Sequence, residues 1–160
     1  MSPVLHDVTL LAYTGAVLMI TLWPSPPDVG SSPVVERLLA WVHDAGVPEG
    51  FDLAALELTA NVAMFVPLGL LLASSARVRA PWLAVAAGLA LSATVETVQI
   101  VLPGRVPTAQ DVVANTAGAA LGASVVVAHR ALRRRRARRA GTAETAVAAG
   151  SAAAVTPSGD

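Results

Sequence analysis

Polar and charged side chains recur at helical spacing inside stretches of the chain that are otherwise apolar. The recurring sets are Glu57 with Asn61, Ser92 with Glu96 and Gln99, and Asp111 with Asn115. Because the members of a set are three or four residues apart, each set would lie on one face of an α-helix. Carboxylates and amides in such places could hold a polar ligand or exchange a proton with it. Inside a membrane they are costly, so they mark a candidate functional site.

The elements that must position these side chains are apolar helices. The chain is 54% hydrophobic and 14% charged, whereas soluble domains carry about 25% charged residues. A spanning helix needs about 20 apolar residues, and four apolar runs approach this length, at about 8–23, 53–76, 80–102 and 111–128. We therefore predict an all-α membrane protein, a bundle of four transmembrane helices in residues 1–128. A soluble bundle would need a polar stripe on each helix, and residues 62–73 show almost none.

The arginine distribution predicts the topology, because Lys and Arg are retained on the cytoplasmic side. All eleven basic residues are arginine, and all but Arg37 and Arg105 lie at 77–79 or 130–139. Four spans place both of these segments on one side. The start of the chain lacks the basic region of a signal peptide, so we keep the first run as a helix. We expect a multi-pass protein of the inner, cytoplasmic membrane with both termini in the cytoplasm.

In this topology the polar sets share one depth. The second helix enters from outside, the third leaves there, and the fourth re-enters. Three pairs therefore fall in the outer half, about 5–12 Å below the surface at 1.5 Å per residue: Glu57 with Asn61, Glu96 with Gln99, and Asp111 with Asn115. Arg105, in the short outer turn between the last two helices, could pair with Glu96 or Asp111. The alternative is that Glu96 is protonated and neutral.

Each polar side chain also has a purely structural interpretation. Hydrogen bonds between helices could account for Asn61 and Asn115, and Glu57 fits a solvated carboxylate at the interface. Function is the better interpretation of Glu96, Arg105 and Asp111, because small polar residues could give the same stability at lower cost.

Helix packing and metal binding can be judged from other residue types. Four residues are predicted to serve helix packing or a kink: Pro67, Gly69, Gly118 and Gly122. The chain has no cysteine, and its three histidines are scattered. We therefore expect no metal site and no cofactor.

Two segments flank the predicted spans. In the outer loop, 24–52, apolar residues repeat at helical spacing from Val34 to Val42, which predicts an amphipathic helix that either lies on the outer leaflet or caps the bundle. In the tail, 129–160, the arginines at 130–139 would contact anionic lipid headgroups. A position beside the membrane accounts for these arginines without a nucleic-acid partner. The Ala-rich part from Ala140 is expected to be disordered.

Three motifs, in this order and spacing, resemble the VanZ-like family of bacterial membrane proteins over about residues 8–128. They are N-x-x-x-F-x-P-x-G from Asn61, S-x-x-x-E-x-x-Q from Ser92, and R-x-P-T-x-x-D-x-x-x-N-T-x-G from Arg105. The family is named for a protein associated with low-level resistance to teicoplanin. The resemblance implies a cell-envelope role but no particular reaction. It also implies a binding site at Asn61, Glu96, Gln99, Arg105, Asp111 and Asn115.

These observations favour a binding protein over an enzyme. We expect an outer-leaflet polar pocket for a polar lipid headgroup or an envelope precursor, and binding there could alter susceptibility to lipoglycopeptides such as teicoplanin. One alternative is a scaffold that forms a homo- or hetero-oligomer through Gly118 and Gly122. Another is an intramembrane enzyme that acts on a lipid-linked substrate through Glu96 and Asp111, although no nucleophile and base pair is evident.

A common depth can be tested by cysteine accessibility, because the chain has no cysteine of its own. Glu96→Cys and Asp111→Cys should both react with a membrane-impermeant maleimide added from outside the cell, since both positions are predicted near the outer surface. Labelling of the two positions from opposite sides of the membrane would contradict the convergence of the polar sets.

Overall fold

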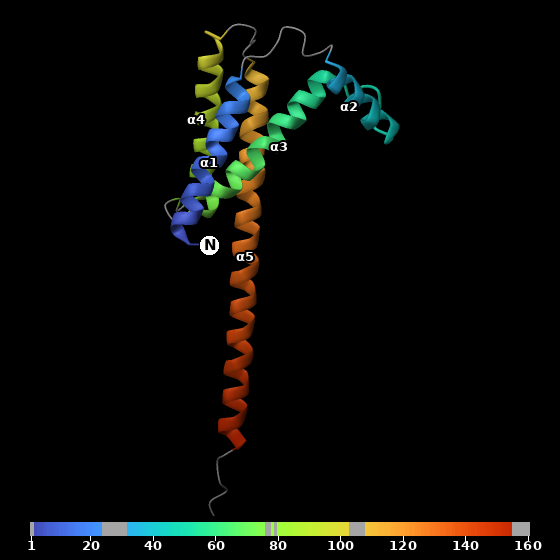
Figure 1. The fold of residues 1–160 in the computed structure, drawn as a ribbon. Coiled ribbons are helices and arrows are strands. Elements are labelled where there is room, and N and C mark those ends of the chain that lie inside the picture. The colour runs from blue at the N-terminus through green and yellow to red at the C-terminus, as the bar shows by residue number, and fades with distance from the viewer. Residues whose placement is uncertain (1, 24–31, 76–77, 79, 103–107, 155–160) are drawn as a thin grey trace, which may run out of the picture. The chain divides into compact units, whose positions relative to one another are not determined.

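A computed structural model describes residues 2–23, 32–75, 78, 80–102 and 108–154, with side chains through Arg139. Every regular element in these residues is a helix (Figure 1): α1 Pro3–Leu22, α2 Pro33–Asp44, α3 Leu53–Ser74, α4 Pro81–Gln99 and α5 Ala109–Ala154. Four segments are long and apolar enough to cross a membrane, namely α1, α3, α4 and the Ala109–Arg139 part of α5. The all-α class with four candidate spans is therefore confirmed. The chain divides into two compact units, Met1–Val125 and Val126–Asp160.

The helix starts follow local sequence signals. Proline occupies the first turn of α1, α2 and α4, where its missing N–H has no intrahelical partner to lose. Helix α3 instead begins after Asp52, whose carboxylate accepts a hydrogen bond from the Ala55 N–H at 3.0 Å. Such an N-cap satisfies one of the unpaired donors of the first turn.

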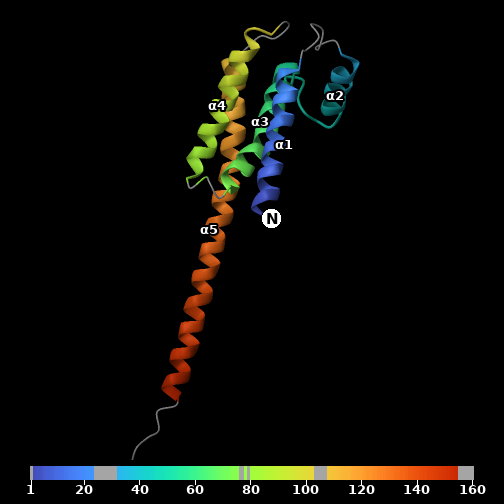
Figure 2. The ribbon, with the colours of Figure 1, turned by 60° about the vertical axis from the view of Figure 1, so that its left-hand side comes forward.

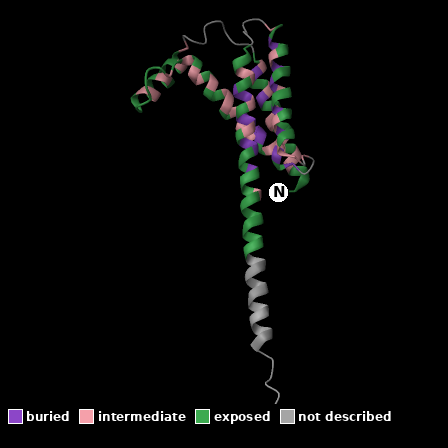
Figure 3. Ribbon diagram, turned by 180° about the vertical axis from the view of Figure 1, so that it is seen from behind, coloured by how far each residue is buried: buried purple, intermediate pink, exposed green. Residues whose placement is uncertain are grey.

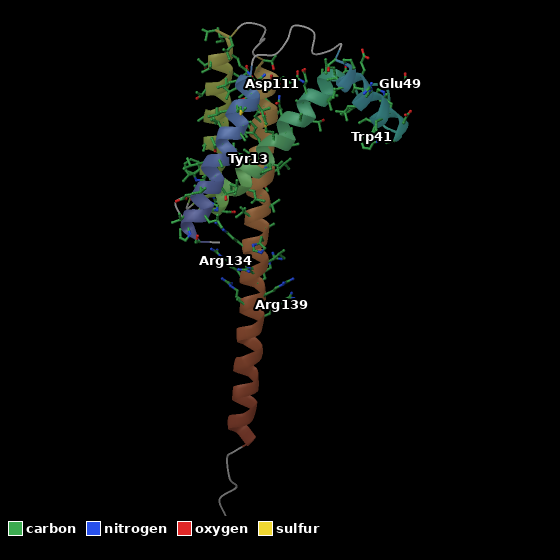
Figure 4. The ribbon with its side chains drawn as sticks, in the orientation of Figure 1. Tyr13, Trp41, Glu49, Asp111, Arg134 and Arg139 are labelled. Atoms are coloured by element: carbon green, nitrogen blue, oxygen red, sulfur yellow. The ribbon has the colours of Figure 1, made fainter. Side chains whose placement is uncertain are left out.

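The last helix differs most from the sequence prediction. A helix over 111–128 and a disordered segment from Ala140 were expected, whereas α5 continues without a break to Ala154. Hydropathy marks where an apolar run ends, but it does not mark where a helix ends. Alanine and arginine are among the strongest helix formers, and they dominate the sequence between Arg130 and Ala154. Residues 131–139 expose their side chains to solvent, and Arg134 and Arg139 are labelled in Figure 4.

The core of the first unit lies where α1, α3 and α4 pack against one another and α3 meets α5 (Figures 2 and 3). Its central buried residues are Val17, Phe65, Leu68 and Ala119. Pro67 lies inside α3 and removes one backbone donor from that helix. The Tyr13 hydroxyl of α1 donates to the Met64 carbonyl, in the turn before this proline, at 2.9 Å. A side chain therefore supports α3 next to its interrupted hydrogen-bond ladder.

Glycines bring the backbones of α3 and α5 into direct contact. A Cβ atom added at any of three positions would overlap backbone atoms of the other helix. The three pairs in contact are Gly69 with the Ala119 backbone, Gly118 with the Val62 carbonyl, and Gly122 with the Val66 carbonyl. Close approach of this kind is a main source of helix association in membranes.

Gly122→Ala should therefore lower the free energy of unfolding by about 1–3 kcal/mol, because the new methyl group displaces the α3 backbone. Gly15→Ala is the matched control, since nothing lies within 4 Å of a Cβ at that position in α1. Unfolding of both variants can be followed by circular dichroism in mixed detergent. An equal loss of stability in the two variants would contradict the close α3–α5 contact.

Candidate functional site

Three helix ends lie together at one end of the first unit, and a fourth helix runs obliquely toward them from the side of α2. Helices α1 and α4 finish there, α5 starts there, and α3 enters from the same side (Figures 1 and 2). Asp111 is labelled at this end in Figure 4. Most of the polar side chains singled out in the sequence lie within these segments and form hydrogen bonds to neighbouring helices.

Asn61 and Asp111 join α3 to α5. The Asn61 Nδ2 atom donates to Asp111 Oδ1 at 2.8 Å, and both side chains are half-buried. An ionised carboxylate is an acceptor for several hydrogen bonds. Among the described residues, Asn61 is the side chain that bonds to Asp111. The Asp111 carboxylate therefore has a fixed orientation and further capacity to accept donors.

Glu96 of α4 caps the start of α5. Its Oε2 atom accepts the Thr108 N–H at 2.9 Å, and the Thr108 hydroxyl accepts the Asp111 N–H at 3.1 Å. In a capping box, the acidic residue three positions after the cap would accept the cap's own N–H. Here a carboxylate from another helix takes that place. Because Glu96 accepts the Thr108 N–H, the Asp111 side chain is available to accept the hydrogen bond from Asn61.

Gln99 closes the end of α1. Its Nε2 atom donates to the Thr21 carbonyl at 2.8 Å. This carbonyl is in the last turn of α1, where helical carbonyls lack an intrahelical donor. Gln99 is 7% exposed, so its amide serves the structure and does not face an open surface.

Asn115 is the most deeply buried of these residues, and its side chain is only half satisfied. It is 3% exposed, and its Nδ2 atom donates to Ser92 Oγ at 2.9 Å. Its Oδ1 atom is buried without a hydrogen-bond partner among the described residues. Turning the amide over would leave the nitrogen unpaired instead. An unpaired buried polar atom costs about 1–3 kcal/mol.

The structure therefore places five of the six predicted binding residues at one end of the first unit: Asn61, Glu96, Gln99, Asp111 and Asn115. Arg105, the sixth, lies outside the described residues. Glu57 is exposed and makes none of these contacts. Among the residues that the structure describes, no three His, Asp or Glu side chains gather as metal ligands would.

Sequence reasoning missed two contributors to this end of the unit. Thr108 precedes Asp111 by three residues, and a threonine at that spacing from an acidic residue is a known signature of a helix start. This signal could have identified Thr108. The other contributor is the Thr21 carbonyl, a backbone atom, and nothing in its own side chain points to the contact with Gln99.

The bond between α3 and α5 can be measured with a double-mutant cycle on Asn61→Ala and Asp111→Ala. We expect a coupling free energy of about 0.6 kcal/mol, the average for hydrogen bonds between membrane helices, and at most about 1.7 kcal/mol. Asn61→Ala combined with Gln99→Ala is the control, because these side chains have different partners and their effects should add. Additive effects for Asn61 and Asp111 as well would show that the two side chains do not interact.

Comparison with known proteins places this site in a family. A family model described as VanZ/LLP1 matches residues 10–131, a segment that holds all the hydrogen bonds described above. Searches of curated proteins and of solved structures found no match. The family match covers most of the chain and agrees with four apolar helices of spanning length. The chain thus belongs to the VanZ-like family and is a multi-pass membrane protein.

Proposed function

We propose that this protein binds the polar head of a membrane lipid or of a lipid-linked envelope precursor at the end of the bundle where α5 begins. The observation that carries the proposal is the half-buried Asp111 carboxylate, to which Asn61 is the bonded side chain among the described residues. This carboxylate can accept further hydrogen bonds, and Asn115 lies one helical turn later on the same face of α5. Together they form an acceptor pair inside a span, where water is scarce.

The chemistry of these groups defines the ligand class. Asp111 and Asn115 present acceptors, which suit the hydroxyl or ammonium donors of a headgroup. Arg105 adds a guanidinium in the connection between α4 and α5, and guanidinium groups bind phosphate in a bidentate manner. A headgroup that combines a phosphate with hydroxyl or ammonium donors would satisfy all three residues.

The proposed setting is the outer leaflet of the inner membrane. This orientation rests on the positive-inside rule, which places the arginines at 77–79 and 130–139 in the cytoplasm. The exposed arginines of 133–139 would then contact anionic headgroups of the inner leaflet. A lipoglycopeptide anchors in the outer leaflet, so a protein that holds lipids or precursors there could alter susceptibility to drugs such as teicoplanin.

The two alternative functions are less well supported. A scaffold that pairs through Gly118 and Gly122 would need these glycines on an open face, but both lie against α3 within the chain. An enzyme that uses Glu96 and Asp111 would need carboxylates available for proton transfer. Each of them instead accepts a hydrogen bond that ties one helix to another, which favours binding over catalysis.

Native mass spectrometry of the protein in mild detergent tests the proposal. The unaltered protein should retain a phosphate-containing lipid, and Arg105→Ala and Asn115→Leu should each release it, because they remove the guanidinium and the buried acceptor. Glu57→Gln is the control, since Glu57 is exposed and outside the hydrogen-bonded set. The proposal fails if the unaltered protein retains no lipid, or if both test variants retain it as well as Glu57→Gln does.

A further inference from the structure

Helix α2 carries an apolar edge that no other part of the described chain covers. None of its residues is buried. Val34, Leu38 and Trp41 are 71%, 41% and 68% exposed, and their spacing places them along one edge of the helix. Glu36, Arg37 and Asp44 lie on the other side of the helix, with the small residue Ala40 between Glu36 and Asp44.

The orientation of α2 is fixed by the turn that follows it. Gly46 has φ +96°, a conformation that suits glycine and ends the helix. The Val47 N–H then donates to the Val42 carbonyl at 3.3 Å, which completes a Schellman closure. His43 Nε2 lies 3.0 Å from the Phe51 carbonyl oxygen, just before α3. These contacts tie α2 to the start of a candidate span.

The direction of the exposed edge can be seen in Figure 4. Trp41 lies on the lower side of α2, the side toward which the spans run, and Glu49 lies on the upper side. The tryptophan therefore points toward the depth that lipid occupies around α3, whereas the carboxylate points away from it. Tryptophan is enriched where membrane and water meet, because its ring is apolar and its N–H is polar.

We propose that α2 lies in the headgroup region of the leaflet at which α1 ends and α3 begins, with Val34, Leu38 and Trp41 inserted between lipids. Membrane binding by such a helix grows with the apolar area that it buries. On its other side, Glu36 and Asp44 outnumber Arg37, so zwitterionic lipid suits it better than anionic lipid. Its connection to α3 also holds α2 close to the membrane, whereas a free helix of this length would have to bind from solution. This inference does not depend on the ligand proposed above.

Fluorescence quenching in phosphatidylcholine nanodiscs tests the proposal on the full chain. In the variant Trp23→Phe/Trp82→Phe, Trp41 is the remaining tryptophan. Phosphatidylcholine brominated in the upper part of its acyl chains should quench Trp41 strongly. Aqueous iodide should quench it at least roughly fivefold less than a tryptophan on the acidic face, where lipid does not cover the helix. The matched control places that tryptophan by Ala40→Trp with Trp41→Phe in the same background.

Two results would overturn the proposal. Equal iodide quenching at positions 40 and 41, without quenching by the brominated lipid, would show that the edge faces water. Protection of Trp41 from iodide without quenching by the brominated lipid would show that protein covers it, as in contact with a second copy. If the double replacement does not fold, the signal of Trp41 is obtained as the difference between the unaltered protein and Trp41→Phe alone.

Discussion

The hydrogen bond between the Thr108 N–H and the Glu96 carboxylate fastens the first turn of α5 to α4. The first donors of a helix have no partner within the helix, so they must bond to water or to other protein groups. Glu96 meets this requirement from another helix, and Asp111 can then bond to Asn61 of α3. Two carboxylates thereby hold three helices at one level. The glycine contacts between α3 and α5 keep the backbones close enough for the bond between Asn61 and Asp111 to form.

The polar residues at this end of the first unit differ in whether their hydrogen-bonding capacity is fully used within the bundle. Gln99 is committed to the end of α1 and is buried, so its contribution is to the bundle. Among the described residues, Asp111 has one bonded oxygen and capacity for more, and the Asn115 Oδ1 atom has no donor. Gln99 thus stabilises the bundle, whereas Asp111 and Asn115 keep hydrogen-bonding capacity that the described residues do not use. Folded proteins tolerate unsatisfied buried polar atoms mainly where a ligand or water can form the missing hydrogen bond.

The sequence predicts the class of fold and the residues of the site better than it predicts the contacts. Hydropathy was sufficient for the four spans, because a membrane demands about 20 apolar residues for each. Spacing by three or four residues put each polar set on one face of its helix, and the alternating direction of the helices put Asn61, Glu96 and Asp111 at one level. The sequence did not indicate that Glu96 would cap a backbone N–H, because that contact depends on where α4 ends relative to the start of α5. The end of α5 was also unpredictable from hydropathy, since alanine and arginine extend a helix beyond the apolar run.

The cap supplied by Glu96 has a consequence for the biogenesis of the protein. Helix α5 emerges from the ribosome after α4, and the acceptor for its first donor lies on α4. A lone α5 would enter without that acceptor, and its exposed first donor would bond to water or a headgroup instead. Insertion of the two helices together as a hairpin supplies the Glu96 acceptor from the start. The nine residues between Gln99 and Ala109 keep the two helices close enough for paired entry.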